Sequence, residues 1–408
     1  GYPAVALIDR DGVSGAPRFH KAALAAGIRP LIGADITIDA QAPGTRHAAP
    51  TGHYFHLPVL CASQEGWKNL CRLLSRMKLR SPKGEGALAI QDLDGFTSGL
   101  IAMPGRPLLQ AERYGVGGLL DRIVGVFGRA NTYVELQRHL QRDQEDDNDA
   151  LVCLADAFRV PVIATGGVAF AAPDERPLFD VLTSIREHVT LMRAGRRLAA
   201  NAERYLKPPE QMARLFADRP EAIHATRDLA DRLQFTMSDL GYRFPTYPIP
   251  DGESEMSFLR KITEVGARNR YRPYHDKARS QVERELDLIA RLDLAGYFLI
   301  VWDIVNYCRQ HDILVQGRGS AANSAVCYSL GITAVDPVGM ELLFERFLSE
   351  ERGEWPDIDL DLPSGDRRES VIQHVYQKYG QHGAAMTANV ITYRGTVSYT
   401  HLTLPTIL

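Results

Sequence analysis

The chain has 408 residues, of which 45% are hydrophobic and 24% are charged. This is the composition of an ordinary globular protein with room for two or three domains. Nothing in the sequence predicts a membrane span or a signal peptide, so we expect a cytoplasmic protein. The net charge of -3 predicts no overall basic surface for nucleic acid. The five cysteines include no Cys-x-x-Cys pair, which favours reduced thiols over disulfides or a zinc site.

The N-terminal part predicts alternating strands and helices. We expect strands at 5–8, 30–38, 99–103, 132–136 and 161–165, and helices at 17–26, 65–77, 119–127 and 148–158. Such alternation is typical of a mostly parallel α/β domain, either a barrel or a doubly wound sheet. The pattern of 209–233 is helical again, and the proline-rich stretch 242–250 predicts an extended connection to a second domain.

The second half predicts helices that lead into a glycine-rich turn. Amphipathic helices are expected at 254–270, with Ser254 as N-cap, at 280–292 and at 298–307. A strand at 313–316 is then followed by two glycines around Arg318 and by a helix over 321–330. With Ser320 as N-cap, the free N–H groups of that helix would form an anion site suited to a triphosphate.

An acidic stretch follows about forty residues later, with Asp357, Asp359 and Asp361 separated by Ile358 and Leu360. In a β-strand all three carboxylates would project from one face, about 7 Å apart. Like charges at that spacing favour a bound cation, and Mg²⁺ prefers such oxygen ligands together with substrate phosphates. Alone, such a short alternation is more often a solvated acidic strand or an acidic turn than a metal site. The upstream anion site favours metal-assisted phosphoryl transfer.

Four stretches carry a resemblance to a known family: 295–303, 316–324, 343–347 and 356–361. Together they closely resemble the palm of bacterial C-family DNA polymerases, the α subunits of DNA polymerase III. The sequence of 349–355 and 362–369 is most similar to that of the error-prone, translesion paralogue. The resemblance implies a DNA-directed DNA polymerase with a PHP-type distorted (β/α) barrel, followed by a polymerase-β-like nucleotidyltransferase palm of α+β type.

The resemblance also implies roles for individual residues. Asp359 and Asp361 would be the catalytic pair that binds two Mg²⁺ ions, with Asp357 in a supporting position. Gly319 and Ser320 would hold the triphosphate. Candidate phosphate contacts are Arg318, Arg346 and Arg352. Ion pairs with Glu345, Glu350 or Glu351 are the alternative for these arginines. The implied partners are primer-template DNA and deoxynucleoside triphosphates, and, through other regions, the sliding clamp and translesion accessory proteins.

The PHP ligands are incomplete. Arg10 stands where a metal-binding family member carries histidine, and Gly166-Gly167-Val168-Ala169 replaces an Asn-Asp-Val-His pattern, which removes two potential ligands. Asp9, Asp35 and His139 remain as a degenerate set, too few for a closed metal cage. We therefore expect a metal-free, structural PHP domain. The alternatives are a metal-dependent phosphoesterase or 3′–5′ exonuclease in this domain, and a non-catalytic scaffold.

The expected domains are a PHP domain at 1–235, a palm with at most the start of the thumb at 236–395, and a non-native tail at 396–408. The resemblance places the third catalytic aspartate, the triphosphate-binding lysine and the fingers beyond the last residue. We therefore expect a fragment, truncated at both ends, with little or no polymerase activity of its own.

Overall fold

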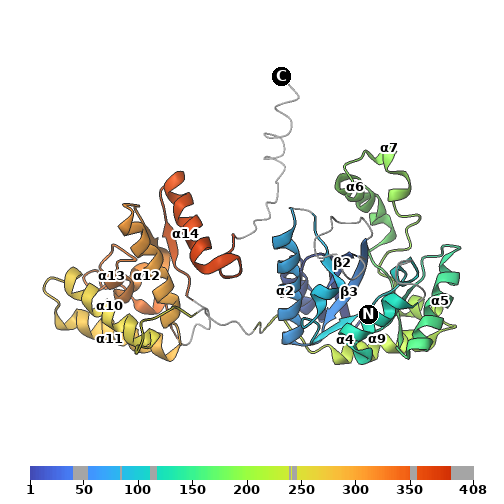
Figure 1. Ribbon diagram of the computed structural model, residues 1–408, viewed down its shortest axis with the longest axis horizontal. Coiled ribbons are helices and arrows are strands. Elements are labelled where there is room, and N and C mark those ends of the chain that lie inside the picture. The colour runs from blue at the N-terminus through green and yellow to red at the C-terminus, as the bar shows by residue number, and fades with distance from the viewer. Residues whose placement is uncertain are drawn as a thin grey trace, which may run out of the picture. The chain divides into compact units, whose positions relative to one another are not determined.

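The computed structural model describes residues 1–39, 54–82, 85–110, 117–238, 240, 246–349 and 356–386. The chain divides into two compact units, Gly1–Tyr242 and Arg243–Leu408 (Figure 1). Each unit has its own hydrophobic core. The division falls at the start of the predicted proline-rich connection.

Unit 1 contains a five-stranded sheet and a two-stranded sheet. In the larger sheet β1 (Ala4–Arg10), β2 (Arg29–Asp39), β3 (Tyr54–Cys61) and β5 (Leu100–Ala102) are neighbours in that order, and β4 (Leu88–Ala89) pairs with β2. The smaller sheet pairs β6 (Val134–Gln137) with β7 (Val162–Thr165) in parallel. An isolated bridge between Ala102 and Thr132 connects the two sheets. Within the described ranges this pairing does not close into a ring.

The predicted mostly parallel domain is confirmed only in part: β1–β2, β2–β4 and β6–β7 are parallel pairs, but the larger sheet is mixed. β2 runs parallel to β1 and antiparallel to β3, and β3 is antiparallel to β5. Both antiparallel pairs involve β3, for which the sequence predicted no strand. Pro58 interrupts its apolar run, and proline is uncommon inside paired strands because it has no N–H group to donate. The carbonyl of Pro58 nevertheless accepts a hydrogen bond from the Met103 N–H at 2.8 Å.

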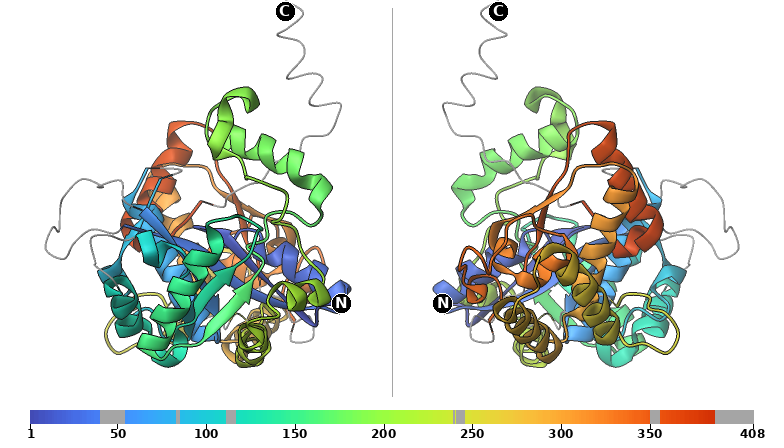
Figure 2. Two further views of the ribbon diagram at one scale, coloured as in Figure 1. Left: turned by 90° about the vertical axis from the view of Figure 1, so that its right-hand side faces the viewer. Right: turned by 90° about the vertical axis from the view of Figure 1, so that its left-hand side faces the viewer.

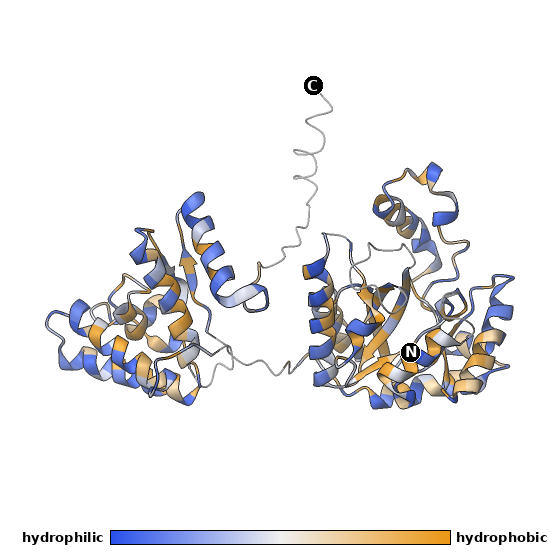
Figure 3. Cartoon of the chain, viewed as in Figure 1, coloured by the Kyte–Doolittle hydropathy of each residue, from blue (hydrophilic) through white to orange (hydrophobic). Residues whose placement is uncertain are grey.

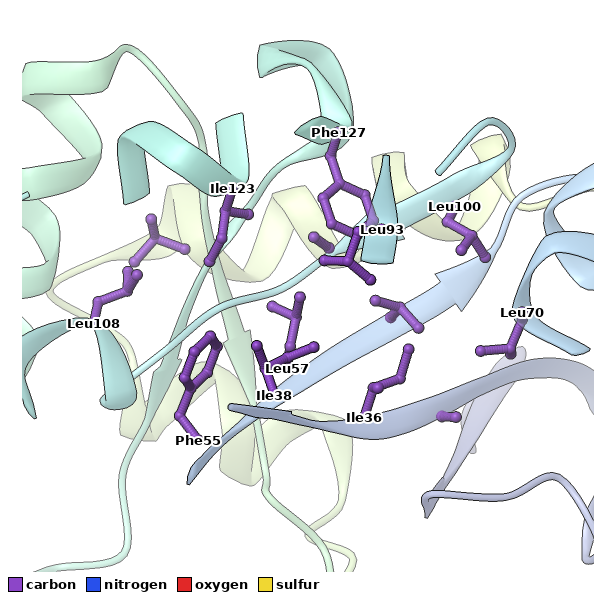
Figure 4. Packing of buried hydrophobic residues seen from close by; sticks show 14 of the residues in the cluster. Ile36, Ile38, Phe55, Leu57, Leu70, Leu93, Leu100, Leu108, Ile123 and Phe127 are labelled. Atoms are coloured by element: carbon purple, nitrogen blue, oxygen red, sulfur yellow. The ribbon is translucent and has the colours of Figure 1, made fainter. Parts of the chain in front are cut away.

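Helices cover the sheets of unit 1. They are α1 (Ala16–Ala25), α2 (Gln64–Arg80), α3 (Pro107–Gln110), α4 (Gly118–Phe127), α5 (Gln144–Phe158), α8 (Pro209–Leu215) and α9 (Pro220–Arg232). Figure 4 shows Ile36 and Leu57 of neighbouring strands packed with Leu70 of α2 and Ile123 of α4. Two further helices, α6 (Arg176–Arg186) and α7 (Leu191–Ala194), project from the rest of unit 1 in Figures 1 and 2.

Unit 2 is mostly helical. Its helices are α10 (Glu255–Arg270), α11 (Asp276–Arg291), α12 (Ala295–Gln310), α13 (Ala325–Leu330) and α14 (Asp366–Gly383). The predicted cap of α10 is confirmed, since Ser254 Oγ accepts the Ser257 N–H at 3.1 Å. Two short strands, β8 (Gln316–Arg318) and β9 (Asp359–Asp361), form an antiparallel pair. No helix in the described part of the chain is long and apolar enough to cross a membrane.

Candidate active site

Strand β9 presents acidic side chains on its outer face. Asp359 and Asp361 are exposed, whereas Leu360 between them is half-buried and packs against the core of unit 2. Asp357 is exposed too, but it precedes the strand, so the prediction that one strand carries all three aspartates is wrong. Strand β9 pairs with β8 in antiparallel. Gln316 lies opposite Asp361, and Arg318 lies opposite Asp359.

The glycine turn lies beside this acidic face. Gly319 follows β8 directly and has φ +70°, a left-handed conformation that glycine adopts without strain. A Cβ atom placed on Gly319 would lie 3.9 Å from Asp359 Oδ2. A hollow of about 580 Å³ opens here, lined by Gly319, Ser320, Asn323 and Arg346. The structure therefore brings the predicted triphosphate-binding turn next to one of the predicted metal ligands.

The helix after this turn begins later than predicted, and Ser320 is not its N-cap. Residues Gly319–Asn323 form a 3₁₀ turn, and α13 starts at Ala325 with Ser324 as N-cap. The first N–H groups of α13 are already occupied. Glu285 of α11, which is fully buried, accepts hydrogen bonds from Ala325 N at 2.9 Å and Val326 N at 3.0 Å. This internal carboxylate fills the anion site that the sequence assigned to a triphosphate.

The predicted phosphate-binding arginines lie in different surroundings. Arg318 Nε lies 3.3 Å from Asp361 Oδ1, and both side chains are more than half exposed. Arg346 lines the hollow. Of its possible acidic partners, Glu345 pairs with Arg284 of α11. The prediction for Arg352, with Glu350 and Glu351, lies outside the described residues.

Asp359 and Asp361 can supply part of a metal site. Within the described ranges, no three His, Cys, Asp or Glu residues group closely enough to hold a metal ion by themselves. Two exposed carboxylates on one strand face nevertheless fit Mg²⁺, which commonly takes one or two carboxylates and completes its shell with substrate phosphates and water. The pair is therefore suited to a metal that arrives with its nucleotide.

The three predicted PHP residues are not brought together. Arg10 pairs with Asp35 in the register of β1 and β2, so their side chains share a face, and adjacent Asp9 points to the opposite one. The side chain of Asp9 instead faces Gly15 at the start of α1. His139 is buried, and its Nε2 lies 2.9 Å from the Gly166 carbonyl. Burial lowers the pKa of His139, which keeps the imidazole neutral.

Asp35 belongs to a cluster of charges, only part of which was predicted from the sequence. Its Oδ2 lies 3.9 Å from both Arg10 Nε and His56 Nδ1. Burial raises the pKa of Asp35, and the positive charges of His56 and Arg10 oppose that rise. Arg204 is also electrostatically close to this carboxylate.

Two members of the cluster come from segments without a recognisable motif. Glu135 of β6 accepts a 2.6 Å hydrogen bond from Thr165 Oγ1, and burial raises its pKa. Arg204 Nε donates to the Gly167 carbonyl at 2.7 Å. Gly167 belongs to the stretch 166–169, where the resemblance implies that two potential metal ligands are missing. No signal in the sequence pointed to Arg204, because it lies in a loop.

Comparison with known proteins agrees with this arrangement. Residues 1–139 match the PHP domain family, and residues 257–400 match the bacterial DNA polymerase III alpha NTPase domain. These two segments are therefore similar to a PHP domain and to a polymerase III alpha domain, respectively.

The curated relatives carry a more specific name than the two family models do. Over 408 aligned residues the chain is 43% identical to proteins named error-prone DNA polymerase from Mycolicibacterium paratuberculosis and Mycobacterium tuberculosis. A protein of the same name from Rhodopseudomonas palustris is 41% identical over 406 residues. These alignments cover 97% of this chain but only 35–37% of the relatives, so the chain spans little more than a third of their length.

Proposed function

We propose that this chain is part of a template-directed DNA polymerase, which adds deoxynucleotides to a primer 3′-hydroxyl during error-prone, translesion repair synthesis. One observation carries the proposal: Asp359 and Asp361 expose their carboxylates on the same strand, and Asp359 lies beside the glycine turn that lines the hollow with Arg346. The names of the relatives support the error-prone subtype.

In this proposal, the residues of unit 2 bind and orient the nucleotide. Asp359 and Asp361 would hold Mg²⁺ ions, which neutralise phosphate charge and lower the pKa of the attacking hydroxyl. Gly319, which has no side chain, lets a phosphate approach the backbone of the turn. Arg346 would contact the phosphates from the wall of the hollow. Arg318 could turn from Asp361 to the triphosphate, because an exposed ion pair is weak.

The structure of the α13 N-terminus changes which groups we expect to bind the triphosphate. Because Glu285 already accepts from Ala325 and Val326, those N–H groups are not available to a triphosphate. We therefore assign phosphate binding to the turn at Gly319 and Ser320, to arginines and to metal ions, and not to a helix dipole.

Primer extension by the full-length polypeptide tests the proposal. Asp359→Asn and Asp361→Asn keep the side-chain size but remove the charge, and we expect each to lower activity at least about a hundredfold. Asp357→Asn is the matched control, since Asp357 is exposed but lies outside β9. A non-catalytic scaffold would be indifferent to all three substitutions. A full-length protein that extends no primer would therefore reject the polymerase assignment, and equal activity of all variants would reject Asp359 and Asp361 as metal ligands.

We further propose that the 408-residue chain alone does not extend primers, because it spans little more than a third of the length of its relatives. Robust extension by this purified chain with Mg²⁺ would contradict that statement. The sliding clamp and translesion accessory proteins remain proposed partners of the longer polypeptide, and the cytoplasm its proposed location.

For the PHP part we propose a structural role and a distorted barrel. The bridge from Ala102 to Thr132 supports the barrel, because it continues the strand order from β5 to β6. Arg10 beside Asp35, and Arg204 on Gly167, place positive charge where a phosphoesterase needs metal ions. Metal analysis of the purified chain tests this role, and stoichiometric Zn²⁺ or Mn²⁺ that depends on Asp35 would overturn it.

A further inference from the structure

Strand β9, which carries the proposed metal ligands, is too short to fix its own position. It has three residues and pairs with the equally short β8 in a two-stranded sheet. An isolated pair of strands is only marginally stable in water. A metal site, by contrast, needs its ligands held to within about 0.5 Å. Other contacts must therefore hold the backbone of β9.

Tyr297 of α12 supplies one such contact directly before the strand. The pairing of β9 with β8 ends at Asp359 and Arg318, because Gly319 leaves the strand with φ +70°. Continued by one residue, the ladder would place Ile358 opposite Gly319. The Ile358 N–H instead donates to the Tyr297 hydroxyl oxygen at 3.0 Å. This hydrogen bond fixes the peptide group that leads into β9, since a partly buried backbone N–H needs an acceptor.

The ring of Tyr297 is itself held by the core of unit 2. It packs edge-on against Phe298, with ring centroids 5.9 Å apart, and Phe298 is fully buried. Ile358 and Leu360 pack against the same core. The hydroxyl of Tyr297 therefore has a defined position, to which the Ile358 N–H is tied.

The chain after β9 is tied to the same helix. Among the residues of α14, all of which the structure describes, Val371 alone is buried, and Figure 3 shows mostly hydrophilic colouring along this helix. Polar and aromatic contacts therefore hold α14 in place. The ring of His374 stacks on Tyr307 of α12, with ring centroids 3.7 Å apart. Lys378 Nζ donates at 2.6 Å to both carboxylate oxygens of Asp303, also on α12. The backbone on either side of β9 is thus fastened to α12.

We propose that Tyr297 is a positioning residue of the metal site. By holding Ile358, its hydroxyl keeps the next residue, Asp359, beside the glycine turn, where a Cβ atom on Gly319 would lie 3.9 Å from Asp359 Oδ2. Tyr297 acts through the backbone of β9 and supplies no metal ligand. The inference rests on the proposed metal-binding role of Asp359 and Asp361.

Mn²⁺ binding to the 408-residue chain tests the proposal without requiring catalysis. Electron paramagnetic resonance measures free Mn²⁺ at a fixed concentration of dATP, against a protein-free reference, and the binding that Asp359→Asn abolishes is the binding at β9. We expect Tyr297→Phe, which removes only the hydroxyl, to weaken that binding about tenfold. An unchanged affinity in Tyr297→Phe would overturn the positioning role alone. If Asp359→Asn abolishes no binding, the metal site and its positioning are both overturned.

Tyr247→Phe is the matched control. The hydroxyl of Tyr247 also forms a 3.0 Å hydrogen bond to α12, which it donates to Asp303, but Tyr247 lies before α10 and not beside β9. We expect the two variants to shift the thermal unfolding midpoint by similar small amounts, and Tyr247→Phe to keep the Mn²⁺ affinity. Equal weakening of Mn²⁺ binding in both variants would indicate a general loosening of α12 and would overturn the proposal.

Primer extension by the full-length polypeptide gives a second measurement. There Tyr297→Phe should raise the Mg²⁺ concentration for half-maximal activity about tenfold, because displaced carboxylates bind the metal more weakly. The KM for primer-template should stay unchanged. A lower kcat with the same Mg²⁺ dependence would indicate only a loss of folded protein and would overturn the proposal.

Discussion

Glu285 offers the sharpest test of how unit 2 positions its glycine turn. Its carboxylate lies fully buried and joins α11 to the start of α13. Besides the two backbone N–H groups, it accepts the Ser324 hydroxyl at 2.7 Å and Gln281 Nε2 at 2.8 Å. Glu285→Ala removes the acceptor of all four donors at once.

The expected cost follows from the groups left behind. The hydroxyl of Ser324 can rotate and Gln281 is half-buried, so these two donors can find other partners. Ala325 N and Val326 N cannot move without unwinding α13, and each buried unsatisfied group costs about 1–3 kcal/mol. Adding a small cavity, we expect Glu285→Ala to lower the free energy of unfolding of unit 2 by about 3–5 kcal/mol. That is a large part of a typical domain's stability of about 5–15 kcal/mol.

Urea unfolding followed by tryptophan fluorescence measures this change. The chain has three tryptophans, and a Trp67→Phe background leaves only Trp302 and Trp355, both within unit 2. Glu283→Ala is the matched control, since Glu283 lies on the same helix but is exposed, and it should change stability by less than about 0.5 kcal/mol. A loss below about 1 kcal/mol for Glu285→Ala would refute the reasoning that this carboxylate holds α13.

Three further outcomes are expected. Gly319→Ala should lower the free energy of unfolding, measured in urea, by about 1–2 kcal/mol, because φ of Gly319 is +70°. Gly317→Ala should lower it more, because the new Cβ would lie 2.7 Å from the Ile332 carbonyl oxygen. Equal losses for the two variants would contradict this reasoning. Arg318→Ala should leave stability unchanged but raise Mn²⁺ affinity, measured by electron paramagnetic resonance, because the guanidinium no longer competes for an acidic side chain of β9. Burial lowers the pKa of His374 from its ordinary 6.5, so the unfolded chain binds that proton more tightly and stability should fall as pH drops below 6.5. A His374→Gln variant should reduce this pH dependence.

The helices of unit 2 were predictable because local signals agree with tertiary packing there. Ser254 provides a cap, and the apolar spacing of 280–292 matches the buried face of α11. In unit 1 the individual strands were largely predictable, but their directions were not. Direction depends on which strands become neighbours, and β3 carries a proline that hides its strand pattern.

The candidate site shows the same limit at the level of single residues. Sequence proximity suggested Ser320 as the cap, but a serine four residues later takes that position because the 3₁₀ turn delays the helix. The partner that closes the anion site, Glu285, lies on a different helix and reads in the sequence as one more charged residue. Long-range hydrogen bonds of this kind become visible only when the chain is folded.

The buried carboxylate at α13 also predicts that nucleotide binding at the proposed site depends on cations. A triphosphate in the hollow would lie near two exposed aspartates, so its own negative charge opposes binding unless positive charge lies between them. The helix N-terminus cannot supply that charge, because Glu285 already occupies it. Arg318 and Arg346 can neutralise the outer phosphates, but Asp359 and Asp361 still require divalent ions. Nucleotide and metal should therefore bind together, each weakly when the other is absent.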